Sequence, residues 1–564
     1  MNEVIDFDAI VVGSGISGGW AAKELTEKGL KVLVLERGRN VEHSKDYPTE
    51  HRGPWELPHR NLPQRDLYRE QYAVQSTHFV FDETTRHFMN NDRDNPYQFD
   101  EQNPFHWIRT EVVGGRSLVW GRQVYRWSEL DFRANARDGH GVDWPIGYDD
   151  LKDWYAYVEK FIGVSGQAEG LPQLPDGEFM KPMKMNVVEQ QFKAKLEQQY
   201  DDRIATIGRV AILTQNHNGR GQCHYCGPCE RGCSTGSYFS SQSATLPAAR
   251  KTGKLTLRPD SVVETLVYDH QQQRVTGVDV VDAVSGEKTR TTGSLVFLCA
   301  STIASTQILL NSKSDAMPQG LANGSGALGH YLMDHTMGMA AVASFDGFGE
   351  DYYYGNRPNV VYLPRFRNLN GKDSDANFIR GYGFQLLGRR SNWRGMYQKV
   401  PGFGAQYKQI LRQPAPWSMM MFGYGECLPA YENMVTLSSQ LDRFGIPQAQ
   451  VTFSWGENEL AMREDITTEA RTMLEVAGAS QVRTSTDIKV PGAAVHEMGT
   501  ARMGKDPASS VLNGFNQAHQ VPNLFVTDGA CMSSSSCVNP SLTYMALTAR
   551  AVDYAVKELQ AGRI

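Results

Sequence analysis

The sequence predicts a mixed α/β (α+β) protein in which a Rossmann-like, dinucleotide-binding domain is interleaved with a second domain built on an antiparallel sheet. Residues 7–38 show the strand, glycine-rich turn, helix and strand of a βαβ unit. Residues 255–299 contain several strand-like runs, and residues 340–455 alternate apolar and polar side chains. A chain of 564 residues also exceeds the size at which one hydrophobic core stops growing, so at least two domains are expected.

The first βαβ unit carries a dinucleotide fingerprint. Gly13, Gly15 and Gly18 have the G-x-G-x-x-G spacing between a buried strand and a helix, and Glu36 ends the next strand. The first glycine permits a tight turn, the second lets a pyrophosphate approach the helix N-terminus, and the third lets helix and strand pack closely. Glu36 is expected to bind the adenosine ribose. This unit alone leaves both FAD and NAD open.

The middle of the chain divides by composition. Residues 41–104 are rich in His, Asp, Arg, Asn and Pro with weak periodicity, which is typical of a long insertion. Residues 136–205 are expected to be mainly helical, and the alternating region is expected to provide the substrate platform. The predicted boundaries assign residues 1–45, 105–135, 205–320 and 485–564 to the dinucleotide-binding domain, 46–104 to an insertion or lid, and 136–204 and 321–484 to the substrate-binding domain.

Composition excludes several classes of protein. Acidic residues outnumber basic ones by 63 to 57 without a Lys/Arg stripe, so nucleic acid is not an expected partner. The mean hydropathy is −0.45 and no stretch of 18 apolar residues occurs, which excludes direct membrane insertion. The acidic start of the chain leaves no room for the basic and apolar regions of an export signal.

Four further blocks lie outside the fingerprint, at residues 113–121, 496–504, 524–529 and 539–543. They contain Gly-Gly-Arg-Ser-Leu-Val-Trp-Gly, His-Glu-Met-Gly-Thr-Ala-Arg-Met-Gly, Leu-Phe-Val-Thr-Asp-Gly and Asn-Pro-Ser-Leu-Thr, and weaker signatures occur at 329–335 and 435–447. With these blocks the chain resembles the glucose–methanol–choline (GMC) oxidoreductase family over nearly its whole length. The resemblance implies a GMC-type FAD-binding domain, because nicotinamide enzymes do not require the C-terminal blocks.

The resemblance also implies how the flavin is held. Some sugar oxidases of the family tether it through a histidine two residues after the Ser of the second block, where this chain has Val119, so non-covalent FAD is expected. The fingerprint and the family blocks together predict a set of cofactor-binding residues. They are Gly13, Gly15, Ser17, Gly18, Glu36, Arg37, Gly114, Gly115, Ser117, Val119, Gly121, Val263, Asp528, Gly529, Pro540 and Ser541.

Two residues are candidates for the chemistry. Oxidation of an alcohol by flavin needs a base for the hydroxyl proton while a hydride leaves carbon, and histidine suits that role near neutral pH. The resemblance puts His496 at the family's base and Asn539 at its second position, which hydrogen-bonds the substrate oxygen. Asparagine cannot take a proton, so the base role falls on His496. A lone histidine is more often structural, but the matched block favours catalysis here.

Four of the eight cysteines are clustered. Cys223, Cys226, Cys229 and Cys233 have the C-x2-C-x2-C-x3-C spacing of bacterial iron–sulfur ligands, with serine in place of the usual following proline. Zinc sites prefer two separated pairs, and a disulfide does not need four close thiols. The spacing predicts a 3Fe-4S or 4Fe-4S iron–sulfur cluster for electron transfer, with buried thiols as the alternative. The other cysteines are expected to be small packed residues.

The substrate is indicated only by resemblance. Residues 53–60, the Gly-Gly-Arg-Ser-Leu-Val-Trp segment and the cysteine run look most like the catalytic FAD subunit of bacterial glucoside 3-dehydrogenase, which oxidises the 3-hydroxyl of a pyranose to a 3-keto-sugar. Sugar binding needs aromatic faces and polar groups in a cleft. Candidates in the antiparallel region are Tyr382, Gln385, Trp393 and Trp417, although each aromatic taken singly is more often a core residue.

The same resemblance implies a sugar or glycoside substrate, a small subunit carrying an export signal and a cytochrome c acceptor. A periplasmic location by co-export with that partner is expected, and a cytoplasmic one otherwise. Alternatives are an oxygen-reducing C-glycoside or pyranose oxidase without a cluster, and another sugar or polyol dehydrogenase of the family. A lyase or isomerase with a structural flavin and a non-enzymatic flavin-binding subunit are further alternatives.

Overall fold

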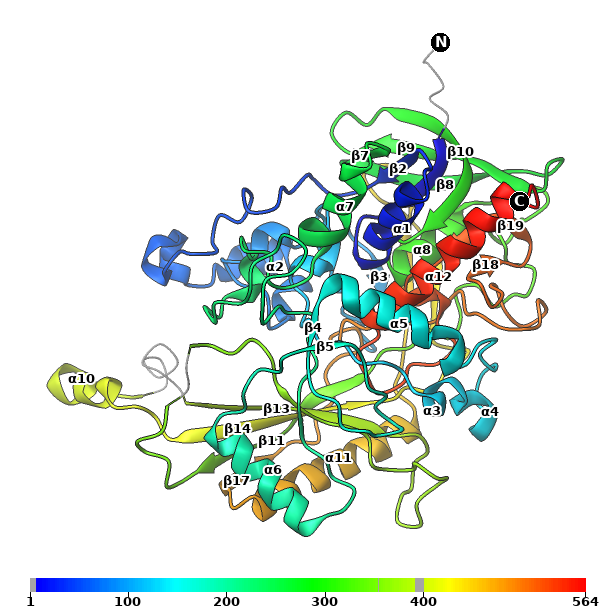
Figure 1. Ribbon diagram of the computed structural model, residues 1–564. Coiled ribbons are helices and arrows are strands. Elements are labelled where there is room, and N and C mark those ends of the chain that lie inside the picture. The colour runs from blue at the N-terminus through cyan, green and yellow to red at the C-terminus, as the bar shows by residue number, and fades with distance from the viewer. Residues whose placement is uncertain (1–6, 353–354, 391–399) are drawn as a thin grey trace.

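A mixed eight-stranded sheet forms the framework of the upper lobe in Figure 1. The computed structural model describes residues 7–352, 355–390 and 400–564. The five central strands run parallel in the order β19, β10, β1, β2, β7, and β18, β9 and β8 extend the sheet with antiparallel pairings. The strands are β1 (Phe7–Val12), β2 (Val32–Leu35), β7 (Leu255–Arg258), β8 (Ser261–Asp269), β9 (Arg274–Asp282), β10 (Lys288–Leu298), β18 (Gln517–Ala518) and β19 (Val521–Val526).

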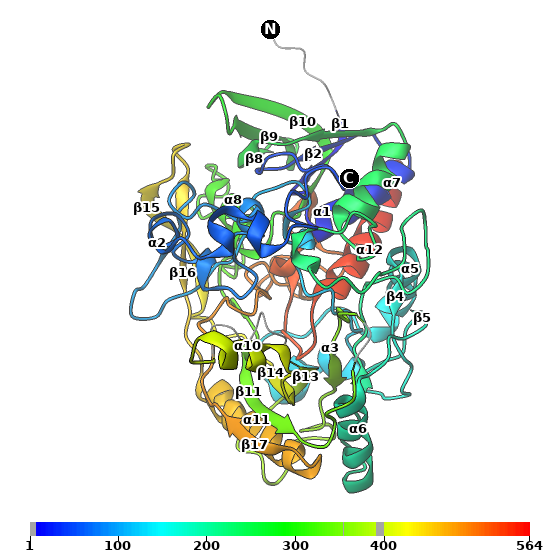
Figure 2. The same ribbon diagram turned by 90° about the vertical axis from the view of Figure 1, so that its left-hand side faces the viewer.

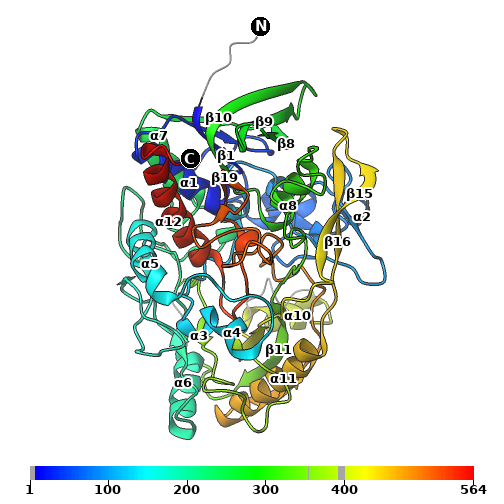
Figure 3. The same cartoon turned by 90° about the vertical axis from the view of Figure 1, so that its right-hand side faces the viewer.

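Helices cover this sheet, which explains why β1 and β2 are nearly uninterrupted apolar runs. Helices α1 (Ile16–Glu27), α7 (Leu246–Lys251) and α12 (Ser541–Gln560) share one core cluster with the central strands. Figure 3 shows α12 between α1 and α5 (Tyr148–Ile162), and α8 (Thr302–Asn311) packs against β8. The predicted βαβ unit and the Rossmann-like fold are thus confirmed.

The lower lobe is built on a six-stranded antiparallel sheet in the order β17, β11, β14, β13, β12, β6. Helices α6 (Val187–Gln199) and α11 (Glu457–Val476) pack on it. Residues 206–207 form its edge strand β6, although the predicted boundary places them in the other domain. The strands are β6 (Thr206–Ile207), β11 (Thr336–Phe345), β12 (Val361–Leu363), β13 (Tyr382–Arg390), β14 (Trp417–Gly425) and β17 (Ser480–Thr484).

Smaller elements lie outside the two main sheets. Figure 2 shows the insertion with α2 (Arg65–Gln71) on the same side of the molecule as α10 (Gly404–Arg412). Residues 163–186, expected to be helical, instead contain short strands. The remaining strands and α-helices are β3 (Gln98–Phe99), β4 (Val164–Ser165), β5 (Phe179–Met180), β15 (Met434–Leu441), β16 (Pro447–Thr452), α3 (Glu129–Phe132) and α4 (Ala134–Asp138). Within the described ranges no helix is both long enough and apolar enough to cross a bilayer.

Candidate active site

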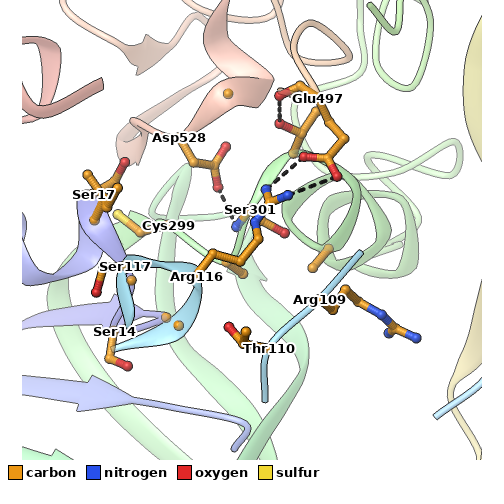
Figure 4. A pocket seen from close by; sticks show the side chains of 18 of the residues that line it. Ser14, Ser17, Arg109, Thr110, Arg116, Ser117, Cys299, Ser301, Glu497 and Asp528 are labelled. Atoms are coloured by element: carbon orange, nitrogen blue, oxygen red, sulfur yellow. Dashed lines mark hydrogen bonds and ion pairs between the residues drawn. The ribbon is translucent and has the colours of Figure 1, made fainter. Parts of the chain in front are cut away.

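A cavity of about 290 Å³ joins the glycine-rich turn to His496 and Asn539. It lies where β1, β2, β10 and β19 end, because the carboxyl ends of parallel strands meet at one edge of the sheet. Figure 4 shows Ser14 and Ser17 of the first βα unit on one side and Arg116 reaching towards Glu497. Of the sixteen predicted cofactor-binding residues, all except Gly18 and Gly114 line this cavity.

The two exceptions lie next to residues that line the cavity. A Cβ on Gly18 would lie 1.9 Å from the Gly13 carbonyl oxygen, so Gly18 serves the close packing of α1 on β1. Gly114 has a left-handed φ of 96°, and its N–H donates to Ser14 Oγ at 2.9 Å. Backbone packing therefore requires Gly18, and the left-handed backbone favours glycine at position 114.

The glycine-rich turn fits a dinucleotide. Gly15 caps α1, and no protein atom lies within 4 Å of the position that a Cβ would take there. No side chain caps the first turn of α1, which leaves its N–H groups for a phosphate. Glu36 accepts hydrogen bonds from the N–H groups of Ser14, at 3.0 Å, and Gly38, at 2.9 Å. Burial raises the pKa of Glu36.

Asp528 and Arg116 carry charge into the middle of the cavity. Asp528 accepts hydrogen bonds from the Ser301 and Ala530 N–H groups, each at 3.0 Å, and burial raises its pKa to about 6. Arg116 forms a two-point ion pair with Glu497, with N–O distances of 3.0 and 2.7 Å. Neither Arg116 nor Glu497 is among the site residues predicted from the sequence, because their pairing joins two distant blocks.

His496 and Asn539 meet at the other end of the cavity. Asn539 Nδ2 lies 3.2 Å from His496 Nε2, and Asn539 Oδ1 accepts a hydrogen bond of 3.0 Å from Gln385. His496 Nδ1 lies 2.9 Å from His335 Nδ1, and the backbone N–H of His496 donates to Asp334 at 3.2 Å. Burial lowers the pKa of His496 well below 6.5, and electrostatic repulsion from His335 and Arg116 lowers it further. A neutral imidazole of this kind can accept a proton.

Asp334 and His335 were not predicted as site residues. The only signal for them was the weak signature at 329–335. Asp334 accepts hydrogen bonds from the backbone N–H groups of Gly492, at 2.8 Å, and His496. Burial, followed by the charge of Glu497, raises its pKa to about 7. Asp334 thus fixes the position of the His496 backbone.

The substrate candidates divide by the face of the sheet. Gln385 contacts Asn539, whereas Tyr382 is fully buried against α11 and its hydroxyl donates to Asp465. Successive side chains of a strand point to opposite faces, so residues 382 and 385 of β13 cannot share one. A substrate-binding role for Tyr382 is therefore wrong. Trp417 likewise packs in the core of the lower lobe, and Trp393 lies outside the described residues.

The cysteine segment does not have the arrangement expected of a cluster. Within the described chain, which includes all four cysteines, no three His, Cys, Asp or Glu side chains are placed to hold a metal ion. Burial raises the pKa of Cys229 to about 12, which favours the protonated thiol. The segment instead packs on the insertion, where the Ser234 N–H donates to Glu50 at 2.7 Å. These residues do not fit an iron–sulfur cluster in this conformation.

Comparisons with known proteins agree with the geometry. Family models described as GMC oxidoreductase match residues 7–337 and 429–548. The chain is 29% identical to 2-methyl-1,2-propanediol dehydrogenase of Mycolicibacterium austroafricanum, over 97% of this chain and 94% of that protein. It is 25% identical to the fructose dehydrogenase large subunit of Gluconobacter japonicus, over the full length of both. The fold resembles pyridoxine 4-oxidase from Mesorbium loti, with a TM-score of 0.61, 16% identity and coverage of 98% and 99%.

Proposed function

The chain belongs to the GMC oxidoreductase family and is an FAD-dependent oxidoreductase acting on CH–OH groups, and we propose that its substrate is a sugar or glycoside oxidised at a secondary hydroxyl. The observation that carries the proposal is the juxtaposition of His496 and Asn539 on the cavity that the fingerprint also lines. Within this class, carbon 3 of a glucoside is the proposed position, and the product is a 3-keto-sugar.

Each residue at the reaction end has a proposed role. Bound FAD would supply the acceptor for the hydride that leaves the alcohol carbon. His496 Nε2 takes the hydroxyl proton, and the Asn539 amide donates a hydrogen bond to the alcohol oxygen. Gln385 holds the Asn539 amide in that orientation. Trp120, Arg122 and Gln123 line the same cavity and supply an aromatic face and polar groups of the kind that a sugar needs.

The cofactor end follows the fingerprint. Gly13 and Gly15 would let the pyrophosphate approach the N-terminus of α1, and Glu36 would accept hydrogen bonds from the adenosine ribose. Val119 lines the cavity and has no nucleophilic atom, which supports non-covalent binding. Denaturation of the holoenzyme is expected to release all of the flavin into the supernatant. Flavin that remained with the precipitated protein would overturn the non-covalent assignment.

The pH dependence follows from the buried base. Because a base must be neutral to accept a proton and the pKa of His496 lies well below 6.5, kcat/KM is expected to hold as the pH falls through 6.5 and to decline only at more acidic pH. Kinetics with an artificial electron acceptor over a pH series measure this. Asp334, which has a pKa of about 7, hydrogen-bonds to His496 through the His496 backbone N–H, and the Asp334→Asn variant removes its titration. An acid limb at 6.5 or above that persists in this variant contradicts the assignment.

The substrate is tested by turnover on a panel of glucosides, free sugars and 1,2-diols. The diols are included because the chain is similar to a diol dehydrogenase. We expect oxidation of glucosides, and NMR of the product is expected to show a carbonyl at carbon 3. A carbonyl at another carbon would overturn the position, and turnover of diols alone would overturn the sugar assignment while leaving the role of His496 intact.

The proposed electron acceptor is a cytochrome-type protein partner. Support comes from the similarity to a chain named as a large subunit, which implies further subunits in that relative. A signal-bearing small subunit would then carry the folded chain to the periplasm. We assign no step to the Cys223–Cys233 segment. Dye reduction is expected to exceed peroxide formation by a wide margin, whereas stoichiometric peroxide would favour the oxidase alternative.

A further inference from the structure

The side chains at the reaction end form one continuous row of hydrogen-bonding groups. Gln385 Nε2 donates to Asn539 Oδ1, and Asn539 Nδ2 faces His496 Nε2. On the other side of the His496 ring, the two Nδ1 atoms of His496 and His335 lie 2.9 Å apart. His335 Nε2 ends the row, 3.1 Å from the backbone carbonyl oxygen of Ser535.

The Ser535 carbonyl gives this row a direction. A carbonyl oxygen can only accept, so His335 Nε2 must carry a hydrogen. In a neutral imidazole the other nitrogen is then an acceptor, and burial keeps His335 neutral by lowering its pKa to about 4. His335 Nδ1 therefore accepts a hydrogen bond from His496 Nδ1. This leaves His496 Nε2 as an acceptor, which is consistent with the Asn539 amide nitrogen that faces it at 3.2 Å.

We propose that His335 is a positioning residue that fixes His496 in the tautomer with hydrogen on Nδ1 and an unprotonated Nε2. The inference rests on the proposed function, since the unprotonated nitrogen is the one assigned to the hydroxyl proton. The donors run one way, from Gln385 through Asn539 and His496 to His335 and the Ser535 carbonyl. Without the Nδ1 acceptor, His496 could hold its hydrogen on Nε2 and could not act as a base there.

The arrangement serves His496 in both protonation states. After His496 takes a proton on Nε2, its Nδ1–H still donates to His335, so the acceptor is not lost during turnover. The other charged and polar groups around His496 do not replace this contact. Asp334 binds its backbone N–H, Arg116 pairs with Glu497, and the Tyr424 ring centroid lies 6.4 Å from that of His496. In this structure, the ring nitrogen Nδ1 of His496 is directed at His335.

The tautomer itself is the primary measurement. In the holoenzyme labelled with ¹⁵N-histidine, the resonances missing from the His496→Gln variant identify His496. We expect a protonated Nδ1 and an unprotonated Nε2 in the wild-type protein without substrate. A protonated Nε2 at neutral pH would overturn the proposal. The measurement of the ¹⁵N resonances requires neither a His335 variant nor turnover.

Two variants at position 335 give the kinetic test. In His335→Asn the amide oxygen can still accept from His496 Nδ1–H, whereas His335→Leu removes the acceptor. We expect kcat/KM to fall about 10- to 100-fold further in the leucine variant than in the asparagine variant, as for other groups that orient a functional histidine. The His496 resonances of the leucine variant should shift towards the Nε2–H form.

Controls separate positioning from folding and from the proposed function. His519→Leu removes a histidine that contacts Ser510 Oγ at 3.0 Å outside the cavity and should leave kcat/KM unchanged. FAD content and melting temperature are compared for all variants. Equal losses in the leucine and asparagine variants, with wild-type resonances in both, would overturn the proposal. If the wild-type protein shows the expected tautomer but oxidises no alcohol, the proposed function fails and the tautomer assignment stands.

Discussion

Replacing His496 with alanine is expected to lower kcat by about 10²- to 10⁴-fold, the usual contribution of a positioned general base. The reason is the loss of the group that takes the hydroxyl proton, while the remaining cavity lining still binds cofactor and substrate. The measurement is steady-state turnover of the best sugar with an artificial acceptor. KM is expected to change much less than kcat, because the Asn539 amide, held by Gln385, can still donate a hydrogen bond to the alcohol oxygen.

The FAD content of the alanine variant shows whether its cofactor site is intact. The His496 backbone N–H still donates to Asp334 in the alanine variant, so FAD content should match the wild-type protein. Retained FAD with a wild-type rate of flavin reduction by the sugar would contradict the base assignment. Loss of FAD along with activity would assign His496 to binding instead of chemistry. His519→Leu again serves as the matched substitution outside the cavity.

A methyl group at Gly15 is expected to separate cofactor binding from folding. The Cβ of Gly15→Ala meets no protein atom within 4 Å, and its backbone φ of −66° is ordinary, so the apo-protein should fold normally. The methyl group projects where the pyrophosphate would approach. An overpacking cost of about 1–3 kcal/mol corresponds to FAD binding that is about 5- to 150-fold weaker. Titration of the apo-protein with FAD measures this.

Two other glycines provide the contrast. In Gly18→Ala the new Cβ would lie 1.9 Å from the Gly13 carbonyl oxygen, so the melting temperature of the apo-protein itself should fall. Gly349 also has open space around its Cβ position but lies away from the cavity. Gly349→Ala should therefore change neither the FAD affinity nor the melting temperature of the apo-protein. Wild-type FAD affinity in Gly15→Ala would show that the cofactor does not approach this turn.

Part of the site could be predicted because short motifs encode it. The spacing of Gly13, Gly15 and Gly18 determines a turn whose geometry needs no distant partner, and Glu36 follows from the end of the next strand. The alternation of residues 340–455 predicted the antiparallel sheet. It did not establish which face of β13 meets the cavity, so Gln385 and Tyr382 were equal candidates until the strand was placed between α11 and Asn539.

For the cysteine run, the spacing of the motif did not predict the arrangement of the side chains. Its spacing is typical of iron–sulfur ligands, but spacing describes only how far apart thiols are along the chain. Here Glu50 binds the backbone of Ser234, and Tyr47 lies against Gly232, so the segment is packed on the insertion. Because the insertion has weak periodicity, its packing partner could not be inferred from the pattern.

The sequence by itself determined the βαβ unit, because the glycine spacing and the two flanking strands are local patterns, and its motif blocks predicted His496 and Asn539 as the reacting residues through the family resemblance. Only the tertiary structure decided how His496 is held. His335 lies 161 residues from His496, Gln385 lies 154 from Asn539, and Arg116 lies 381 from Glu497. Hydrogen bonds over such separations exist only after the chain has folded and brought these distant segments together. The tautomer proposed for His496 therefore depends on contacts that only the folded molecule provides.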